Sequence, residues 1–161
     1  MKVVIPDLVS NSYFPAIAAV ELGFFKQEGI DATLELIYPV GKCYDALRDG
    51  AVDFVGGSSH SAPTAFSEWK GVKFLGALAQ HTYWFLIMRA DLNVKRGDVA
   101  AVKGKRIGAA PLIDIGLIEL LKEYGIDPKR DGVQIAPPPM PANPAGVSFG
   151  VNAAKAMEEG K

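Results

Sequence analysis

The sequence predicts an α/β protein built from two similar lobes. Short β-rich runs alternate with helical patterns along the 161 residues, and half-way along the chain the order of the elements starts again. The triplet Gly-Ile-Asp also occurs once in each half, at residues 29–31 and 125–127, each time after a helical pattern and before a strand. Short strands separated by helices are typical of a parallel sheet, and a chain of this length suffices for one domain or for two small lobes.

In the first half, proline and glycine mark where the elements begin and end. Pro6 ends the first β-rich run, Pro15 suits the first turn of a helix, and Gly29 and Gly50 end helical patterns. The predicted strands are residues 2–5, 33–38, 52–55 and 72–78, and the predicted helices are residues 15–25, 44–48 and 61–69.

The centre and the second half continue the alternation. The wholly apolar run at residues 84–88 predicts a buried strand, and the rise in charge between residues 89 and 102 indicates a boundary between lobes. The later elements are strands at 105–109 and 133–136, helices at 115–124 and 148–159, and a proline-rich loop at 137–144. Because no strand follows the last helix, we expect the second lobe to be incomplete within these residues.

Composition excludes several classes of protein. The single cysteine, Cys43, excludes an internal disulfide framework and a cysteine-rich zinc site, and two histidines argue against a metal site built on imidazole. No apolar stretch reaches the ~18 residues of a membrane-spanning helix, and the opening MKVVIPDLVS indicates a strand rather than a signal peptide. The net charge of −1 lacks the basic bias of nucleic-acid binders. We therefore expect no metal, no nucleic acid and no membrane insertion.

Four loops follow predicted strands and precede predicted helices, at residues 11–13, 41–43, 58–60 and 111–114. Backbone N–H groups are unpaired at such places and bind small polar ligands in α/β folds. The ligand-binding candidates in these loops are Asn11, Ser12, Tyr13, Lys42, Ser58, Ser59, His60 and Asp114. The alternative is that these side chains only cap helices. His81 and Tyr83 are interpreted as further hinge or cleft groups.

The segment at residues 56–60, Gly-Gly-Ser-Ser-His, offers the most ligand chemistry. Two glycines allow the backbone to approach a ligand closely, and the hydroxyls and the imidazole can bond to it. The segment lacks the lysine and spacing of a phosphate-binding loop, and it is not a Gly-x-Ser-x-Gly nucleophile elbow. Adjacent Ser59 and His60 seldom face each other usefully, and Cys43 is interpreted as structural. No residue is therefore predicted to be catalytic.

Several segments together resemble the solute-binding proteins of ABC importers. The segments are NSYFPAIAAVELGFFKQEGIDATLEL, ALRDGAVDFVGGSSHSA, VKGKRIGAA and the helix before YGIDP, and they follow the family's order over nearly the whole chain. The group is that of the receptors for nitrate, sulfonate, taurine and pyrimidine precursors, the NMT1/THI5-like family.

The resemblance implies a type II periplasmic-binding-protein-like fold, in which two α/β lobes joined by hinge strands close on a ligand held between them. It places the first lobe at residues 1–86 and the second, incomplete lobe at residues 87–161. It also implies a periplasmic receptor without a cofactor or enzymatic activity, which captures a small polar or heteroaromatic molecule and delivers it to a membrane permease.

The second-lobe loop departs from the family's pattern. Anion receptors of the family often have glycine and hydroxyl residues there, whereas this chain has Pro111, Leu112, Ile113 and Asp114. An aspartate at a helix N-terminus already occupies the positive end of the helix dipole. This disfavours nitrate or sulfonate and favours a neutral or cationic heteroaromatic ligand, or one with a single carboxylate.

Two other functions stay open. One is a pyrimidine-precursor synthase of the same fold, although that enzyme has a cysteine-rich segment and this chain has only Cys43; bound pyridoxal phosphate or turnover would identify it. The other is the effector-binding domain of a regulator, although no helix-turn-helix precedes Met1 in this sequence.

Overall fold

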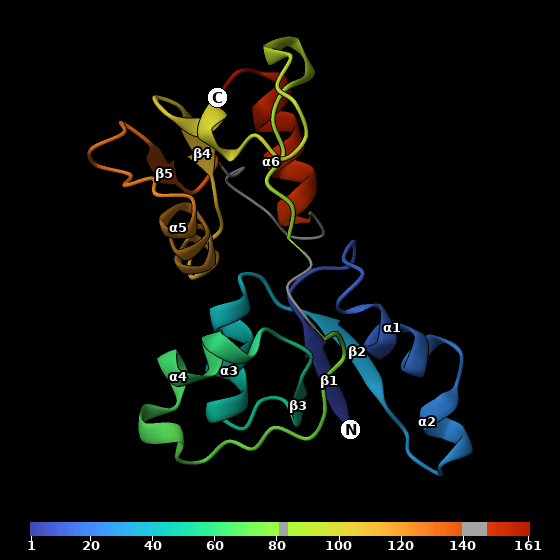
Figure 1. Ribbon diagram of the computed structural model, residues 1–161. Coiled ribbons are helices and arrows are strands. Elements are labelled where there is room, and N and C mark those ends of the chain that lie inside the picture. Colours follow the sequence, from blue (N-terminus) through green and yellow to red (C-terminus); the bar gives the residue numbers. More distant parts are fainter. Residues whose placement is uncertain (81–83, 140–147) are drawn as a thin grey trace. The chain divides into compact units, whose positions relative to one another are not determined.

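The computed structural model in Figure 1 describes residues 1–80, 84–139 and 148–161. These residues form two compact units, one made of residues 1–80 with 148–150 and the other of residues 84–139 with 151–161. Both units are mixed α/β with parallel strands, as the sequence predicts. The division into lobes at residue 86 stays a prediction.

The first unit contains a three-stranded parallel sheet of β1 (Lys2–Ile5), β2 (Thr33–Leu36) and β3 (Phe54–Val55). The strand order is β2-β1-β3, with Val3 opposite both Leu34 and Phe54. The central strand is buried from Val3 to Ile5, because a parallel strand with neighbours on both sides and helices over its faces has no side exposed to water. This explains why residues 3–5 are a continuous apolar run.

Helices flank this sheet, with α1 (Phe14–Glu21) and α2 (Phe24–Gln27) on one side and α3 (Val40–Arg48) and α4 (Ala62–Ala65) on the other (Figure 1). The predicted single helix at 15–25 is wrong, since Gly23 adopts a left-handed φ of 74° between α1 and α2. The predicted helix at 61–69 ends early for a similar reason. Phe66 is extended and Glu68 has a φ of 53°, so only a 3₁₀ turn follows at Ser67–Trp69.

The second unit contains a two-stranded parallel sheet of β4 (Arg106–Gly108) and β5 (Gln134–Ala136), connected by α5 (Ile113–Glu123). Its core consists of Val102, Leu121, Ile126 and Val133, all at most 6% exposed. The last helix, α6 (Phe149–Glu158), buries Asn152 and Ala156 on one face. These elements confirm the strands and helices that the sequence predicts in this half, with their ends shifted by one or two residues.

The two Gly-Ile-Asp triplets have the same backbone geometry. Gly29 and Gly125 have φ values of 74° and 67°. The Ile30 N–H donates to the Phe25 carbonyl at 2.8 Å, and the Ile126 N–H donates to the Leu121 carbonyl at 2.9 Å. This is the Schellman ending of a helix, in which a left-handed glycine lets the following N–H reach back five residues. The repeat therefore marks one physical device used twice.

Two predicted strands are wrong. Residues 72–78 are mostly apolar and residues 84–88 wholly so, but neither segment is assigned to a strand. In the second segment burial alternates: Leu86 and Met88 pack on the core of the second unit, whereas Phe85 and Ile87 are 83% and 66% exposed. The segment is thus hydrophobic enough for a strand, but within the described residues no neighbouring strand accepts its backbone hydrogen bonds.

A carboxylate network joins the loop before β5 to the turn before β4. The Asp131 carboxylate accepts hydrogen bonds from the Asp127 N–H at 2.9 Å and from Arg130, and it forms an ion pair with Lys103 at 3.0 Å. The Asp131 backbone carbonyl accepts from the Gly104 N–H at 2.9 Å. The hydrogen bond from Arg130, followed by those from the Asp127 N–H and Lys103, holds the pKa of Asp131 well below its ordinary value.

We expect the stability of the second unit to depend on pH through Asp131. A depressed carboxyl pKa stabilises the folded state above the ordinary value of 3.8, and this contribution is lost as the pH falls below 3.8 toward the folded-state pKa. Asp131→Asn should therefore be less stable than the parent at pH 7, with the difference narrowing below pH 3.8. Urea unfolding of the parent and of Asp131→Asn at pH 7 and at pH 3 measures the difference in stability at each pH. A stability difference that is the same at both pH values would contradict the role of the Asp131 carboxylate.

Candidate functional site

The carboxyl ends of β1 and β3 lie side by side in the first unit and define the candidate ligand site. The chain leaves β1 toward α1 and leaves β3 toward α4, and these two helices lie on opposite sides of the sheet (Figure 1). Adjacent parallel strands whose connections leave in opposite directions form a topological switch point, where α/β proteins bind ligands. The loops at residues 6–13 and 56–61 begin at the carboxyl ends of β1 and β3 respectively.

The loop after β1 is held by hydrogen bonds at both of its ends. The Asp7 carboxylate accepts from the Val9 N–H at 2.7 Å, and the Ser10 carbonyl accepts from the Tyr13 N–H at 3.2 Å. The hydroxyls of Ser10 and Ser12 bond to each other at 2.8 Å, and Ser12 is only 6% exposed. Ser12 is therefore part of the loop's internal structure, whereas Asn11 is exposed.

The loop after β3 is held by a tyrosine of α3. The Tyr44 hydroxyl donates to the Ser58 carbonyl at 2.9 Å, and the Ser58 and Ser61 hydroxyls bond to each other at 2.8 Å. Tyr44 is 3% exposed, and burial, with a smaller effect of neighbouring Cys43, raises the pKa of Tyr44 to about 12. The hydroxyl is thus a permanent donor at neutral pH, while Ser59 and His60 are exposed on the same loop.

Protein atoms occupy the space that the two glycines of this loop leave open. A Cβ added to Gly56 would lie 3.0 Å from Ile5 Cγ2 and 3.2 Å from Leu78 Cδ1, and one added to Gly57 would lie 3.0 Å from the Tyr44 hydroxyl. The glycines are therefore required by packing between β1, β3 and α3, rather than by close approach of a ligand to the backbone.

The helix-capping alternative is wrong for these loops. The residues at the N-cap positions of α1, α3, α4 and α5 make no side-chain capping hydrogen bond. The side chains of Asn11 and Ser59 make no hydrogen bond to any described residue. These two exposed polar groups, one on each loop of the switch point, are available to a ligand.

The remaining candidates lie elsewhere. Lys42 is in the first turn of α3 rather than in a loop, and its amine is 3.9 Å from the Asp45 carboxylate. Asp114 is half-buried in the first turn of α5, at the carboxyl end of β4 in the second unit. His81 and Tyr83 lie outside the described residues. The loops carrying Asn11–Tyr13 and Ser58–His60 thus start from paired strands, and the ligand-binding role of every candidate residue stays a prediction.

Three groups that shape the site are not predicted by the local sequence: Asp7, Tyr44 and Ser61. All three act through contacts between segments that are distant in the chain or through burial, as with the Tyr44 bond to Ser58 fourteen residues away. Cys43 is structural, as the sequence predicts: its thiol donates to the Ile37 carbonyl at 3.0 Å, and burial raises its pKa to about 12. A thiol in this state is not a nucleophile.

We expect Tyr44→Phe to loosen the loop at Ser58–His60. The change removes one hydrogen bond and leaves the Ser58 carbonyl without its donor, which should lower the free energy of unfolding by about 1 kcal/mol and speed amide exchange at residues 58–61. Tyr124→Phe is the matched control, because Tyr124 is 58% exposed. Equal unfolding and exchange in the two variants would show that the Tyr44 hydroxyl does not hold the loop.

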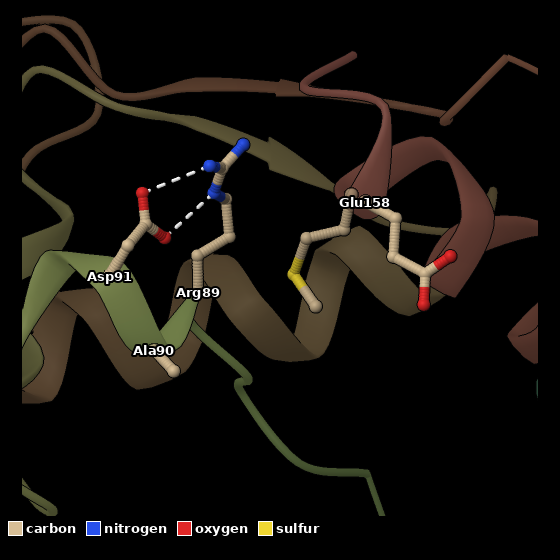
Figure 2. Close-up of a pocket in the computed structure, with 5 residues that line it drawn as sticks. Arg89, Ala90, Asp91 and Glu158 are labelled. Carbon is tan, nitrogen blue, oxygen red and sulfur yellow. Dashed lines mark hydrogen bonds and ion pairs between the residues drawn. The ribbon is translucent and has the colours of Figure 1, made fainter.

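Neither of two surface hollows, one lined by residues 47–48, 65–68 and 70–71 and the other by residues 89–91 and 157–158, contains a predicted site residue. Figure 2 shows the one in the second unit, a hollow of about 320 Å³ lined by Arg89, Ala90, Asp91, Met157 and Glu158. The Arg89 guanidinium donates two hydrogen bonds of 2.9 Å to the Asp91 carboxylate, which lowers the pKa of Asp91. Because the charges of Arg89 and Asp91 are paired with each other, the hollow is a poor candidate for a ligand site.

In the described parts of the chain, no group of three or more histidine, cysteine, aspartate or glutamate side chains is placed to hold a metal ion. Within the same residues, no helix combines the length and the apolar character needed to cross a membrane.

A parallel α/β unit with polar loops gathered at a switch point is the arrangement of an α/β ligand-binding protein. The family model described as "NMT1/THI5 like" matches residues 10–137, and the chain belongs to this family. The family has a periplasmic-binding-protein-like fold and includes solute-binding proteins of ABC importers as well as THI5 synthases. No curated protein matches the chain significantly, and no solved structure does.

Proposed function

We propose that this chain is the solute-binding receptor of an ABC importer, and that it captures a small heteroaromatic molecule at the carboxyl ends of β1 and β3. One observation carries the proposal: two loops with ligand-available polar side chains, Asn11 and Ser59, start from adjacent strands at the switch point. Membership of a family that includes such receptors supports it.

The surroundings of the first loop favour a ring over an inorganic anion. Leu8, Val9 and Phe14 flank the polar residues and are 49%, 65% and 62% exposed. Ligand sites for organic molecules combine apolar and aromatic walls with a few polar groups, and an asparagine such as Asn11 offers both a donor and an acceptor to the edge of a heteroaromatic ring. By contrast, the Lys42 amine already lies near Asp45.

The same proposal assigns a location and a partner. Receptors of this kind work in the periplasm and deliver their solute to a membrane permease, and we propose both for this chain. The alternatives are a synthase, which the same family includes, and the effector-binding domain of a regulator. The thiol of Cys43 is buried and protonated, which removes this cysteine as a nucleophile for a synthase.

Native mass spectrometry of protein purified without added ligand tests the receptor function and the ligand class together. We expect a co-purified heteroaromatic compound, and we expect a hydroxymethyl-substituted aminopyrimidine to raise the melting temperature where taurine and nitrate do not. Stabilisation by nitrate or taurine alone would overturn the heteroaromatic assignment, and catalytic turnover of any bound compound would overturn the receptor function.

We expect Ser59→Trp to abolish binding of that aminopyrimidine, because the indole would fill the space beside the loop. Ser59 is exposed, so the stability should stay within ~1 kcal/mol of the parent. Thr33→Trp is the matched control. Thr33 is exposed at the amino end of β2, whereas the ligand loops begin at the carboxyl ends of the strands in the same sheet. Calorimetric titration measures the affinity of both variants for the aminopyrimidine. Unchanged affinity in Ser59→Trp would mean that the ligand binds elsewhere.

A further inference from the structure

Asp7 joins two segments that are 141 residues apart in the chain. Its Oδ1 accepts from the Val9 N–H at 2.7 Å, and its Oδ2 accepts from the Ser148 hydroxyl at 2.7 Å and from the Phe149 N–H at 3.2 Å. The Ser148 hydroxyl oxygen accepts in turn from the Gly150 N–H at 3.2 Å. Both carboxylate oxygens are thus used, one on each segment.

The Ser148 side of the contact is buried, and Asp7 is half-buried. Ser148 is 4% exposed, and its hydroxyl also lies 3.3 Å from the Val9 carbonyl, so the loop and the start of α6 meet through more than one pair of atoms. Hydrogen bonds to an ionised carboxylate are stronger than those between neutral groups. Negative charge at the first turn of α6 is further favoured by the helix dipole.

The segment that Asp7 holds is the ligand loop after β1. The Val9 amide near the start of this loop is bonded to Asp7, and the bonded Ser10–Ser12 pair and the Ser10–Tyr13 turn follow directly. A loop fixed at its start by one carboxylate and at its end by one turn depends on both for its conformation. The start of α6 depends on the same carboxylate.

We propose that Asp7 is a positioning residue, which couples the order of the ligand loop at residues 8–13 to the order of the first turn of α6. Asp7 itself need not touch the solute. The assignment of residues 8–13 as a ligand loop rests on the proposed function, whereas the coupling does not. Coupling between two segments is reciprocal, so loosening either one loosens the other.

Amide exchange measured residue by residue by NMR tests the coupling without any ligand. In Ser148→Ala the Val9 amide keeps its own acceptor, Asp7 Oδ1, yet it should exchange at least about tenfold faster than in the parent. In Asp7→Asn the Gly150 amide keeps its own acceptor, Ser148 Oγ, and should also exchange faster. The double variant should be no faster than the faster single variant, and Ser148→Thr should restore protection because it keeps the hydroxyl.

Asp53→Asn is the matched control. The Asp53 carboxylate accepts from the Lys2 N–H at 2.7 Å, at the opposite end of β1, and its loss should leave the Val9 and Gly150 amides unchanged. Parent-like exchange of Val9 in Ser148→Ala would overturn the coupling. Affinity for the aminopyrimidine should fall about tenfold in Asp7→Asn. If the parent binds no such compound, the proposed function fails while the exchange rates still decide the coupling.

Discussion

Leu121→Ala should destabilise the second unit by about 2–5 kcal/mol, the range for deleting a buried leucine side chain. Leu121 is 0% exposed and lies in the core with Val102, Ile126 and Val133. The Ile126 N–H also donates to the Leu121 carbonyl at the Schellman ending of α5, so the residue lies where the helix, its ending and β5 meet. The unit is small, and its two-stranded sheet has little other buried surface with which to fill the cavity.

Urea unfolding followed by circular dichroism measures this effect. Leu120→Ala is the matched control on the same helix, since Leu120 is 39% exposed and should lose at most about 1 kcal/mol. Equal losses in the two variants would mean that α5 packs through a different face from the one described.

Gly56→Val should destabilise the first unit by about 3 kcal/mol, at the upper end of the range for overpacking a core. Gly56 lies directly after β3, and its N–H donates to the Val4 carbonyl at 2.8 Å. The new side chain would overlap with Ile5, which is 0% exposed and cannot move without disturbing the central strand. We also expect weaker binding of the aminopyrimidine, because β1 and β3 carry the two ligand loops.

The control for this variant is Gly41→Val. Nothing lies within 4 Å of a Cβ added to Gly41, and its φ is not left-handed. Because valine is at least as good a helix former as glycine, the stability should stay within about 0.5 kcal/mol of the parent. A Gly56→Val protein as stable as the control would show that β1 and β3 can separate at their carboxyl ends.

The candidate site therefore depends on close packing beneath it as much as on the polar groups at its surface. Gly56 and Gly57 bring β1, β3 and α3 together, and Tyr44 and Asp7 each hold one of the loops that this packing places side by side. Substitutions in this supporting layer should change affinity without removing any group that contacts the solute.

Local patterns in the sequence determined the class of fold and the places where the chain turns. Strands β1, β4 and β5 and helix α5 follow from apolar periodicity, and the endings at Gly29 and Gly125 follow from glycine's access to left-handed backbone. These features depend on neighbours in the chain, so a single sequence contains their causes. The loops that carry Asn11 and Ser59 follow from the same local patterns, because each lies between a predicted strand and a predicted helix.

Only the tertiary structure decided which apolar runs are strands and which polar groups remain available. Residues 84–88 have the composition of a strand but pair with no strand among the residues that the structure describes, because pairing requires a second strand that no local pattern supplies. In the sequence, Ser12 and Ser58 are as good ligand-binding candidates as Asn11 and Ser59. In the structure, the Ser12 hydroxyl is bonded to Ser10 and the Ser58 hydroxyl to Ser61. The contact between Asp7 and Ser148 joins residues 141 positions apart. The local sequence around either residue contains no information about the other, because such a bond forms only when the whole chain has folded.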